Sequence, residues 1–476
     1  MDGEEEDIRK AGEHEEPETE QQPAPEDEHE VGLSDEFIAE ILELESHQYT
    51  DRIQELCRDL AAPDAAELLA KVGADQRHHL IQILETVIPP DTFTYLDKAM
   101  MNDLFEYMSG AHIASIVNEL ESDDAISLIN DLPQDRRADI MRNLSRKVRA
   151  AVEEGLTFPE HSAGRLMQRE FVAIPQFWTI GKTVDYLRAA ADSLPDRFYD
   201  VFIVDPSHRF VGAVSLSRLL CAQRAVKVDT LVSEEHVTIP VTMDQEQVAF
   251  QFRRKDLLSA PVVDDENRLI GVVTVDDVVD VIDQEAGEDL LKLGGVTSSD
   301  IHRTMVSTAR LRSIWLTVNL GTAFLDTAVI SMFSGAIQKI VALAALMPIV
   351  ASMGGNAGTQ TLTVVIRAMA TKEISAANVW RVVWKECAVG ILNGFFFAIL
   401  MTAIVYYFYQ DMKLALVMAA ALIFNLFAAG LTGALIPLGL AKVGLDPAPS
   451  SAIFLTTVTD VVGFMAFLGL ATWFLM

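Results

Sequence analysis

The sequence predicts a multidomain α-helical membrane protein, in which an acidic soluble part precedes five membrane-spanning helices. Charge is the first observation. The chain carries 37 Lys+Arg and 69 Asp+Glu, a formal net charge of -32. Residues 311–476 hold six acids and eight bases, which leaves 63 acids and 29 bases, a net charge of -34, for the preceding part of the chain. Such a soluble part should repel nucleic acid and anionic lipid headgroups and attract cations.

The N-terminal third is expected to be helical after a disordered tail. Fourteen acids and three prolines precede Val31, which predicts an acidic disordered tail over residues 1–33. From 34 to 160, apolar residues recur at helical spacing, with Pro, Gly or Asp every ten to fifteen residues, which predicts short helices. Residues 123–144 should form two of them, with Pro133 in the first turn of the second. Stacked helix pairs of an α-solenoid fit best, and a generic helical bundle fits nearly as well.

Residues 161–285 contain an internal repeat. Residues 202–215 (FIVDPSHRFVGAVS) align without a gap on 261–274 (PVVDDENRLIGVVT). Each unit shows a buried strand, a polar turn, a second buried strand and a helix, a pattern that resembles a pair of α/β CBS domains at 165–225 and 226–285. Such pairs typically sense adenosyl ligands or metals and gate an attached domain. This segment is therefore expected to regulate and not to catalyse.

The second repeat continues into a strongly acidic helix. Asp277, Asp280, Glu285, Glu288 and Asp289 follow its second strand. Like charges at helical spacing destabilise a helix by a few tenths of a kcal/mol per pair unless a cation intervenes. These acids are therefore candidates for a cation site, and a solvated charged helix face is the alternative.

Five apolar segments follow the acidic part. Each exceeds the roughly 20 residues needed to cross a bilayer. Basic residues border the first segment and the second and fourth connections, whereas the other connections hold only Lys339 and Lys413. The positive-inside bias then predicts a cytoplasmic N terminus and an extracytoplasmic C terminus. The segments cover residues 314–333, 340–369, 382–409, 414–440 and 449–475, within a membrane domain at 313–476.

Asp460 is the only charged residue in the last thirty positions and lies within the fifth apolar segment. A carboxylate at bilayer depth costs about 2.5 kcal/mol or more, so it normally faces a polar path and binds something positive. A structural hydrogen bond to a neighbouring helix is the alternative. Asp326 is a second acid, in the first segment. It should either meet a water-filled vestibule or pair with Lys339.

The second apolar segment contains the run MPIVASMGGNAGTQ at 347–360. Its proline frees a backbone carbonyl, and Gly354, Gly355 and Gly358 permit the close approach of another helix. Irregular backbone at membrane depth survives only beside a cavity or other protein. Asn356 can supply an oxygen atom to a passing ion. The alternative is that Gly354 and Gly358 serve helix packing alone.

These motifs closely resemble the MgtE family of magnesium channels over about residues 50–476. The family implies a homodimer whose pore lies on the two-fold axis and is lined by the second and fifth spans. Asp460 of both chains would then face each other, with Thr456 and Thr457 nearby. Mg²⁺ keeps several waters and usually takes one or two carboxylates, so such a pair suits it. The resemblance rests on residues 348–360, 384–394, 446–460, 159–167 and 285–295.

The resemblance also implies regulation by the transported ion. A connecting plug helix, at 283–312, would close the cytoplasmic mouth. Without Mg²⁺ the acidic side chains around this helix would repel one another and the cytoplasmic parts would separate. With Mg²⁺ bound, these parts would come together and hold the plug in place. The family resemblance also suggests ATP as a ligand of the CBS pair, and no local sequence motif indicates whether it binds. Family metal-binding positions carry over onto Asp256, Asp277, Asp280, Glu285, Glu288 and Asp289, with Asp123 and Asp124 as weaker candidates.

The sequence therefore predicts a non-enzymatic magnesium transport protein of the inner or plasma membrane. Mg²⁺ would be both its substrate and its regulatory ligand, and the protein would act as a homodimeric channel. A secondary active transporter for divalent cations such as Mg²⁺ and Co²⁺ is the first alternative. A membrane-anchored magnesium sensor without transport is the second.

Overall fold

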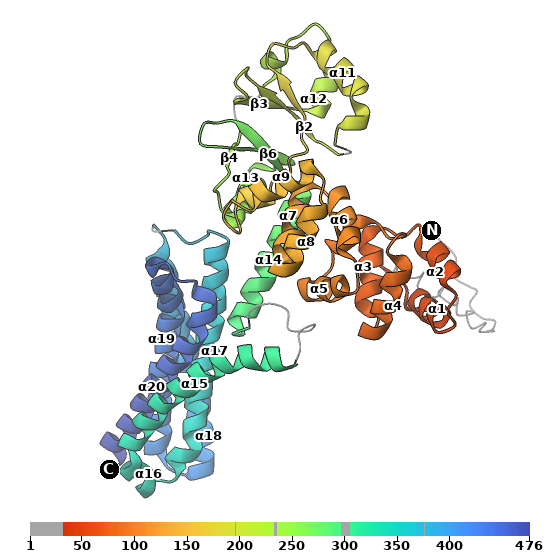
Figure 1. The fold of residues 1–476 in the computed structure, drawn as a ribbon. Helices are drawn as coiled ribbons and strands as arrows, with labels where there is room; N and C mark the ends of the chain where they lie inside the picture. The colour runs from red at the N-terminus through yellow and green to blue at the C-terminus, as the bar shows by residue number, and fades with distance from the viewer. Residues whose placement is uncertain (1–31, 196, 233–235, 297–304, 376) are drawn as a thin grey trace, which may run out of the picture. The chain divides into compact units, whose positions relative to one another are not determined.

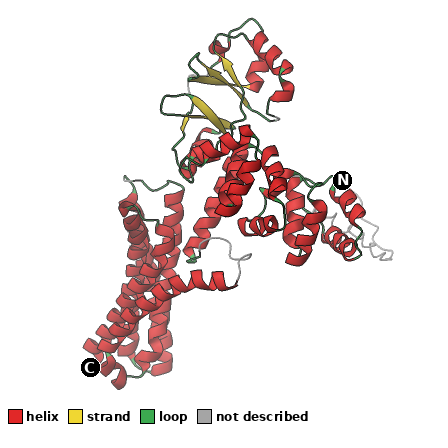
Figure 2. Ribbon diagram, in the orientation of Figure 1, coloured by secondary structure: helices red, strands yellow, loops and turns green. Residues whose placement is uncertain are grey.

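The computed structural model describes residues 32–195, 197–232, 236–296, 305–375 and 377–476, without the side chains of 448–450. The predicted acidic tail thus lies almost entirely outside the described residues. The chain divides into two compact units, Met1–Glu153 and Glu154–Met476. Figure 1 labels their helices and strands, and Figure 2 shows that the strands are confined to one region of the second unit.

Every secondary-structure element described in the first unit is a helix. Ser34, Asp97 and Ser109 begin α1, α5 and α6 by accepting a hydrogen bond from a backbone N–H of the first turn. The two helices predicted within 123–144 are α7 and α8, with Pro133 at the N-cap of α8. The elements are α1 Asp35–Ser46, α2 Thr50–Cys57, α3 Ala62–Lys71, α4 Ala74–Leu84, η1 Pro90–Phe93, α5 Lys98–Glu106, α6 Gly110–Glu119, α7 Ser122–Asp131, α8 Gln134–Asn143 and α9 Arg146–Gly155.

The second unit begins with two similar three-stranded sheets, β1-β2-β3 and β4-β5-β6. In each sheet the first two strands are parallel and the last two antiparallel. Ile203 pairs with Gly212, and the equivalent Val262 pairs with Gly271, so the two repeats share the same strand register. This confirms the internal repeat. The strands are β1 Ala173–Pro175, β2 Asp200–Val204, β3 Phe210–Ser215, β4 Ile239–Pro240, β5 Ser259–Val263 and β6 Leu269–Thr274.

Short helices surround these sheets, and α14 is the longest of them. It runs over Val275–Leu293 and is followed by Gly294 and Gly295, the latter at φ +71, a left-handed conformation that glycine adopts readily at the end of a helix. The connecting helix expected at 283–312 is therefore not one helix: it comprises the second half of α14, residues 297–304 outside the described ranges, and the start of α15. The others are α10 Ala163–Leu166, α11 Ile180–Ala189, η2 Ala191–Ser193, α12 Leu216–Cys221, η3 Val228–Leu231 and α13 Gln245–Lys255.

Five long helices correspond to the five predicted spans. Among the described residues, four helices are long and apolar enough to cross a membrane: α15, α18, α19 and, within α20, Ser451–Leu475. Helix α17 has 29 residues, but its glycines and polar residues such as Asn356 lower its hydropathy. The bounds are α15 Met305–Met332, α16 Ser334–Lys339, α17 Ala342–Ala370, α18 Val379–Tyr409, α19 Met412–Val443 and α20 Pro447–Leu475.

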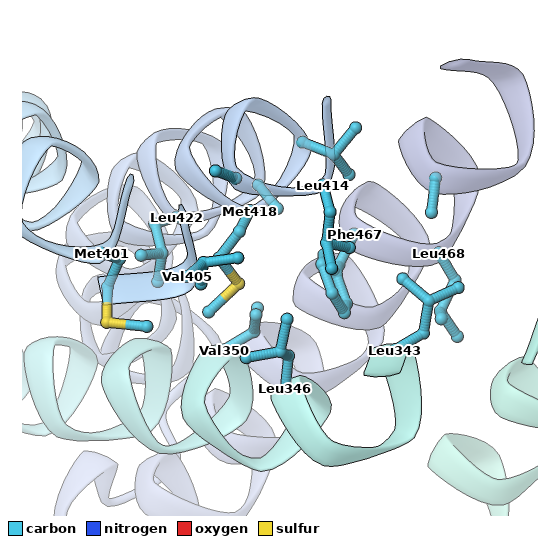
Figure 3. Packing of buried hydrophobic residues seen from close by; sticks show 14 of the residues in the cluster. Leu343, Leu346, Val350, Met401, Val405, Leu414, Met418, Leu422, Phe467 and Leu468 are labelled. Carbon is cyan, nitrogen blue, oxygen red and sulfur yellow. The ribbon is translucent and has the colours of Figure 1, made fainter. Parts of the chain in front are cut away.

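Helix α19 is the centre of this bundle, because it packs against α17, α18 and α20. Figure 3 shows the apolar contact, in which Leu346 and Val350 of α17 lie beside Met418 and Leu422 of α19 and Phe467 of α20. In lipid such contacts stabilise through close packing and not through the exclusion of water. In contrast, α15 buries no residue within the chain and packs mainly on α20.

Candidate functional site

One face of α17 carries a row of polar side chains. Ser352, Asn356, Thr359 and Thr363 are all exposed and, spaced four, three and four residues apart, lie in one stripe along the helix. The hydroxyl of Thr359 donates to the Gly355 carbonyl at 2.9 Å, and that of Thr363 donates to the Thr359 carbonyl at 2.9 Å. Their oxygen lone pairs therefore remain available as acceptors. We call these four residues the α17 polar stripe.

The opposite face of α17 holds two of the predicted glycines. A Cβ at Gly354 would lie 2.2 Å from Asn425 Nδ2, and one at Gly358 would lie 2.9 Å from Leu455 Cδ1. Both glycines thus permit close packing on α19 and α20, as the alternative interpretation required. Gly355 differs, because a Cβ there meets nothing within 4 Å.

Asp460 lies on α20 and is partly exposed. Asp326 of α15 is close enough for the two carboxylates to interact electrostatically. Asp326 Oδ1 is buried without a hydrogen-bond partner, and no ion pair joins Asp326 to Lys339 in the described part of the chain. The pairing considered as an alternative does not occur, and the first span instead brings a second carboxylate near Asp460.

Thr456 and Thr457 lie one turn before Asp460 on the same helix. Their hydroxyls donate to the carbonyls of Ala452 and Ile453 at 3.0 and 2.8 Å. As on α17, the hydroxyl protons are directed at the backbone, so the oxygen atoms can accept hydrogen bonds or face a cation. Thr456 is exposed and Thr457 is half-buried.

A second group of acids surrounds the C-terminal half of α14. It comprises Glu246 of α13, Glu285, Glu288 and Asp289 of α14, and Asp446, and we call it the α14 acidic cluster. Burial, and then the charge of Glu285, raises the pKa of Glu246. Burial raises the pKa of Asp289 too; Lys292 opposes this shift, and Asp446 adds to it. The cluster thus holds repelling carboxylates that are partly removed from water.

Lys292 supplies a positive charge to this cluster. Its Nζ lies 3.5 Å from Glu288 Oε2 and 3.4 Å from Asp446 Oδ2, so it joins α14 to the residue just before α20. Burial acts to lower the pKa of Lys292, but Asp446 and Glu288 together outweigh it and hold the pKa above its usual range.

The cluster lacks a ready-made chelate. Within the described ranges, no three His, Cys, Asp or Glu side chains are close enough to hold a bare metal ion. Magnesium dehydrates reluctantly and usually binds through one or two carboxylates while it keeps several waters.

The remaining predicted acids of the second unit lie elsewhere. Asp277 Oδ2 accepts hydrogen bonds from Thr274 Oγ1 at 2.7 Å and from Gln168 Nε2 at 3.2 Å, near the start of α14. Asp280 lies among other acids of α14, and burial, then neighbouring Asp276, raises its pKa. Asp256 ends α13 in a left-handed conformation at φ 52.

The two weaker candidates belong to the first unit. Asp123 and Asp124 lie in the first turn of α7, where negative charge favours the positive end of the helix dipole. Asp123 is 7% exposed, whereas Asp124 lines a cavity of about 90 Å³ together with Lys98 and Asp131. A structural role at the helix start accounts for their position.

Sequence reasoning missed Glu246, Asp446 and Lys292 as members of the cluster. Glu246 lies on the helix before α14, and Asp446 follows α14 only after four of the five long apolar helices. Only tertiary packing brings them together, so helical spacing could not reveal them. Asp446 carried a sequence signal of another kind, since it begins the 446–460 motif on which the family resemblance partly rests.

Two cavities adjoin these groups. One of about 500 Å³ lies beside the cluster, between α13, α14 and the C-terminal end of α17, and is lined by apolar side chains together with Arg253 and Arg367. The other, between the two repeats near Asp200 and Ser259, has only about 10 Å³, room for roughly one water. A nucleotide would need that cleft to open.

Comparison with known proteins identifies the family. A model described as "Divalent cation transporter" matches residues 347–470, one described as "MgtE intracellular N domain" matches 60–161, and one for the CBS domain matches 228–284. The chain is 34% identical to the magnesium transporter MgtE of Thermus thermophilus over 325 residues, 68% of this chain and 72% of that protein. This chain belongs to the MgtE family.

A second curated relative and two solved structures are also similar to this chain. The magnesium transporter MgtE of Bacillus subtilis is 32% identical over 326 residues, 68% of this chain and 72% of that one. The crystal structure of the soluble part of a magnesium transporter is 29% identical and covers 53% of this chain and 98% of its own, with a TM-score of 0.46. The cytosolic domain of the Mg²⁺ channel MgtE in complex with ATP is 26% identical over 51% of this chain and 99% of its own, with a TM-score of 0.47.

The family models and the curated relatives confirm the family resemblance. The protein is a membrane protein of a magnesium-transporting family, with a CBS domain and transmembrane helices. The family model for the CBS domain matches the second repeat.

Proposed function

We propose that this protein is a homodimeric, Mg²⁺-selective channel that closes when intracellular Mg²⁺ binds its cytoplasmic acids. The α17 polar stripe is the observation that carries this proposal. It is exposed on the single chain although its helix lies among membrane-spanning helices. Polar side chains at membrane depth face water or protein, so the stripe needs a water-filled path or a second protein surface, and we place the ion path there.

A second copy of the chain would enclose that path. The stripe on α17 and Asp460 on α20 would then line it from both sides. Hydroxyl and amide oxygens can accept hydrogen bonds from the waters of a hydrated ion, and the two Asp460 carboxylates would supply the negative charge. A path that contacts the ion through its waters favours Mg²⁺, which retains them, over Ca²⁺, which binds protein oxygens more readily.

The α14 acidic cluster would provide the regulation. Its carboxylates repel one another without a cation, and Lys292 offsets this only in part. Binding of Mg²⁺ favours the arrangement in which the acids are close together, by the difference between its affinities for the two arrangements. Asp446 would transmit this change to α20, which carries Asp460. ATP in the CBS pair is a further proposed ligand, on the family resemblance alone.

The proposed arrangement in the membrane follows from the loop charges. All five long helices, α17 included, would span the membrane, with the N terminus in the cytoplasm and the C terminus outside. The proposed domains are a helical domain at 34–160, a CBS pair at 161–285, a connecting segment at 283–312 and a pore domain at 313–476.

Mg²⁺ flux into liposomes tests the pore assignment. Purified full-length protein should admit Mg²⁺ passively, and Asp460→Asn, which removes one charge without changing shape, should lower the flux at least tenfold. Asp411→Asn is the matched control, because Asp411 accepts hydrogen bonds from the first turn of α19 and Asn caps helices equally well. Normal flux through the Asp460→Asn variant would refute the pore assignment.

Two further measurements separate this proposal from its rivals. The ion flux through one open channel gives discrete current steps, which the slower turnover of a carrier does not produce. Robust Mg²⁺ flux without such steps would favour a secondary transporter. If wild-type protein admits no Mg²⁺ but becomes protected from protease when the ion is added, the protein is a sensor.

A further inference from the structure

Asn425 is the only polar side chain of α19 between Lys413 and Thr432. It is completely buried, at 0% exposure. Its Nδ2 donates to the Val350 carbonyl of α17 at 2.8 Å, and its Oδ1 has no hydrogen-bond partner. A buried amide that satisfies only one end is costly. Filling space between helices does not by itself account for this buried amide, because an apolar side chain would fill the same space without that cost.

The amide fills a space left by two glycines on different helices. A Cβ at Gly354 of α17 would lie 2.2 Å from Asn425 Nδ2, and a Cβ at Gly463 of α20 would lie 2.7 Å from the same atom. Val350, which Figure 3 shows near Leu346 and Met418, also borders this space, with its Cγ1 3.1 Å from the Cβ position at Gly463. Asn425 is thus the contact at which α17, α19 and α20 meet.

This junction lies next to both parts of the proposed ion path. Gly354 precedes Asn356 of the α17 polar stripe by two positions, and Gly463 follows Asp460 by three. Three positions along a helix correspond to a rise of about 4.5 Å. Asp460 is therefore close to the junction along α20. Any shift of α20 against α17 at the junction moves Asp460 relative to the stripe by about the size of that shift.

We propose that Asn425 is a positioning residue for ion recognition. Its hydrogen bond to Val350 sets the height of α19 against α17, and its fit between the two glycines sets the rotation and height of α20. Together they hold Asp460 at a fixed place relative to the stripe. This inference rests on the proposed function, in which α17 and α20 line the path.

Asn425→Leu tests the proposal, because leucine has a similar size but cannot hydrogen-bond. The variant and wild type are reconstituted in liposomes, and Mg²⁺ flux is measured against Mg²⁺ concentration and against Ca²⁺ as competitor. We expect a KM about fivefold higher and weaker discrimination against Ca²⁺, since small displacements of a recognition group have large effects. Fewer folded molecules, with KM and discrimination unchanged, would show a merely structural role and overturn the proposal.

A substitution on α20 provides an independent measurement. Gly463→Ala leaves Asn425 in place, and its methyl group meets Asn425 Nδ2, so it should displace α20 and raise the KM. Gly469→Ala on the same helix is the control, since a Cβ there meets nothing within 4 Å. A KM for Gly463→Ala no higher than that of Gly469→Ala would contradict the proposal.

These outcomes also separate this inference from the proposed function. Absence of Mg²⁺ flux through wild-type protein would overturn both. Flux through wild type, with KM and Ca²⁺ discrimination unchanged in Asn425→Leu, would overturn the positioning role alone.

Discussion

Asp460 and Asn425 are both isolated polar residues in apolar helices, but their surroundings differ. Asp460 is partly exposed, near a second carboxylate, whereas Asn425 is enclosed by two glycines and a backbone carbonyl. Because Asp460 is exposed, its carboxylate can contact an ion. Because Asn425 is enclosed, its amide can contact only the neighbouring helices. Solitary polar residues at membrane depth can thus serve two purposes, and burial distinguishes them.

The carboxylate of Asp326 should strengthen cation attraction at Asp460. For Asp326→Asn we expect the KM for Mg²⁺ flux to rise about threefold at moderate salt, because one nearby negative charge is lost in a region of low dielectric constant. Asp411→Asn, on another helix, is the control. An unchanged or lower KM would indicate that Asp326 does not contribute to the potential along the ion path.

At the level of single residues, the sequence revealed the groups that are unusual for their surroundings. Asp460 was predictable because a charge in an apolar run is costly. The cluster members Glu246 and Asp446 were not, because they are unusual only beside α14, which tertiary packing decides. The Asp277 carboxylate accepts hydrogen bonds from the hydroxyl of Thr274 and the amide of Gln168, and its role as a metal ligand stays a prediction.

Among the elements, α14 carries the cluster and its counter-charge. For Lys292→Met we expect Mg²⁺ to protect the segment after α14 from protease at a several-fold lower concentration, because one more negative charge remains to attract the ion. Limited proteolysis at a series of Mg²⁺ concentrations measures this. Lys227→Met, at an exposed position outside the α14 acidic cluster, is the control, and a need for more Mg²⁺ would show that Lys292 assists closure.

Glu246 and Asp289 make the same element sensitive to pH. Their pKa values are raised in the folded protein, so between the unfolded and folded values the folded state binds more protons. The free energy of unfolding without Mg²⁺ should therefore rise as pH falls through the folded pKa values. Mg²⁺ must displace those protons, so its affinity should fall over the same range.

Thermal unfolding of the detergent-solubilised chain checks this expectation. The Tm increase that saturating Mg²⁺ produces should shrink as the pH is lowered from neutral toward the carboxyl range. The Glu246→Gln/Asp289→Asn variant should show a weaker pH dependence. An equal dependence in that variant would assign the effect to other groups.

The end of α14 is set by a local signal. Gly294 and Gly295 are a local stop signal, and the left-handed φ of Gly295 ends the helix there. The segment at 283–312 therefore contains a helix end that its own residues specify. Its role as a plug stays a prediction.

At the scale of the whole molecule, charge and repetition predicted the architecture. The acidic half, the recurrence of 202–215 at 261–274 and the apolar runs are one-dimensional patterns, and each corresponds to a described part. Helix partners are not such a pattern. Nothing in the apolar sequence of α19 distinguishes it as the central helix, because surface complementarity decides which helices pack.

The proposed homodimer gives a prediction for the assembled protein. In a variant whose three cysteines are replaced by serine, Thr359→Cys should form a disulfide-linked dimer in membranes after mild oxidation, because the α17 polar stripes would face each other. Leu392→Cys is the control, since Leu392 is exposed on α18 and should face lipid. Equal cross-linking of both variants, or of neither, would argue against the proposed dimer.

The continuity of α14 has a mechanical consequence. Its first residues follow β6 of the second repeat, and Lys292 near its end holds the ion pair with Asp446, so one continuous helix joins this sheet to the start of α20. Its full length, at a rise of about 1.5 Å for each residue, makes a lever about 28 Å long. A tilt of about 10° at its base would move its tip by about 5 Å, roughly the diameter of two water molecules.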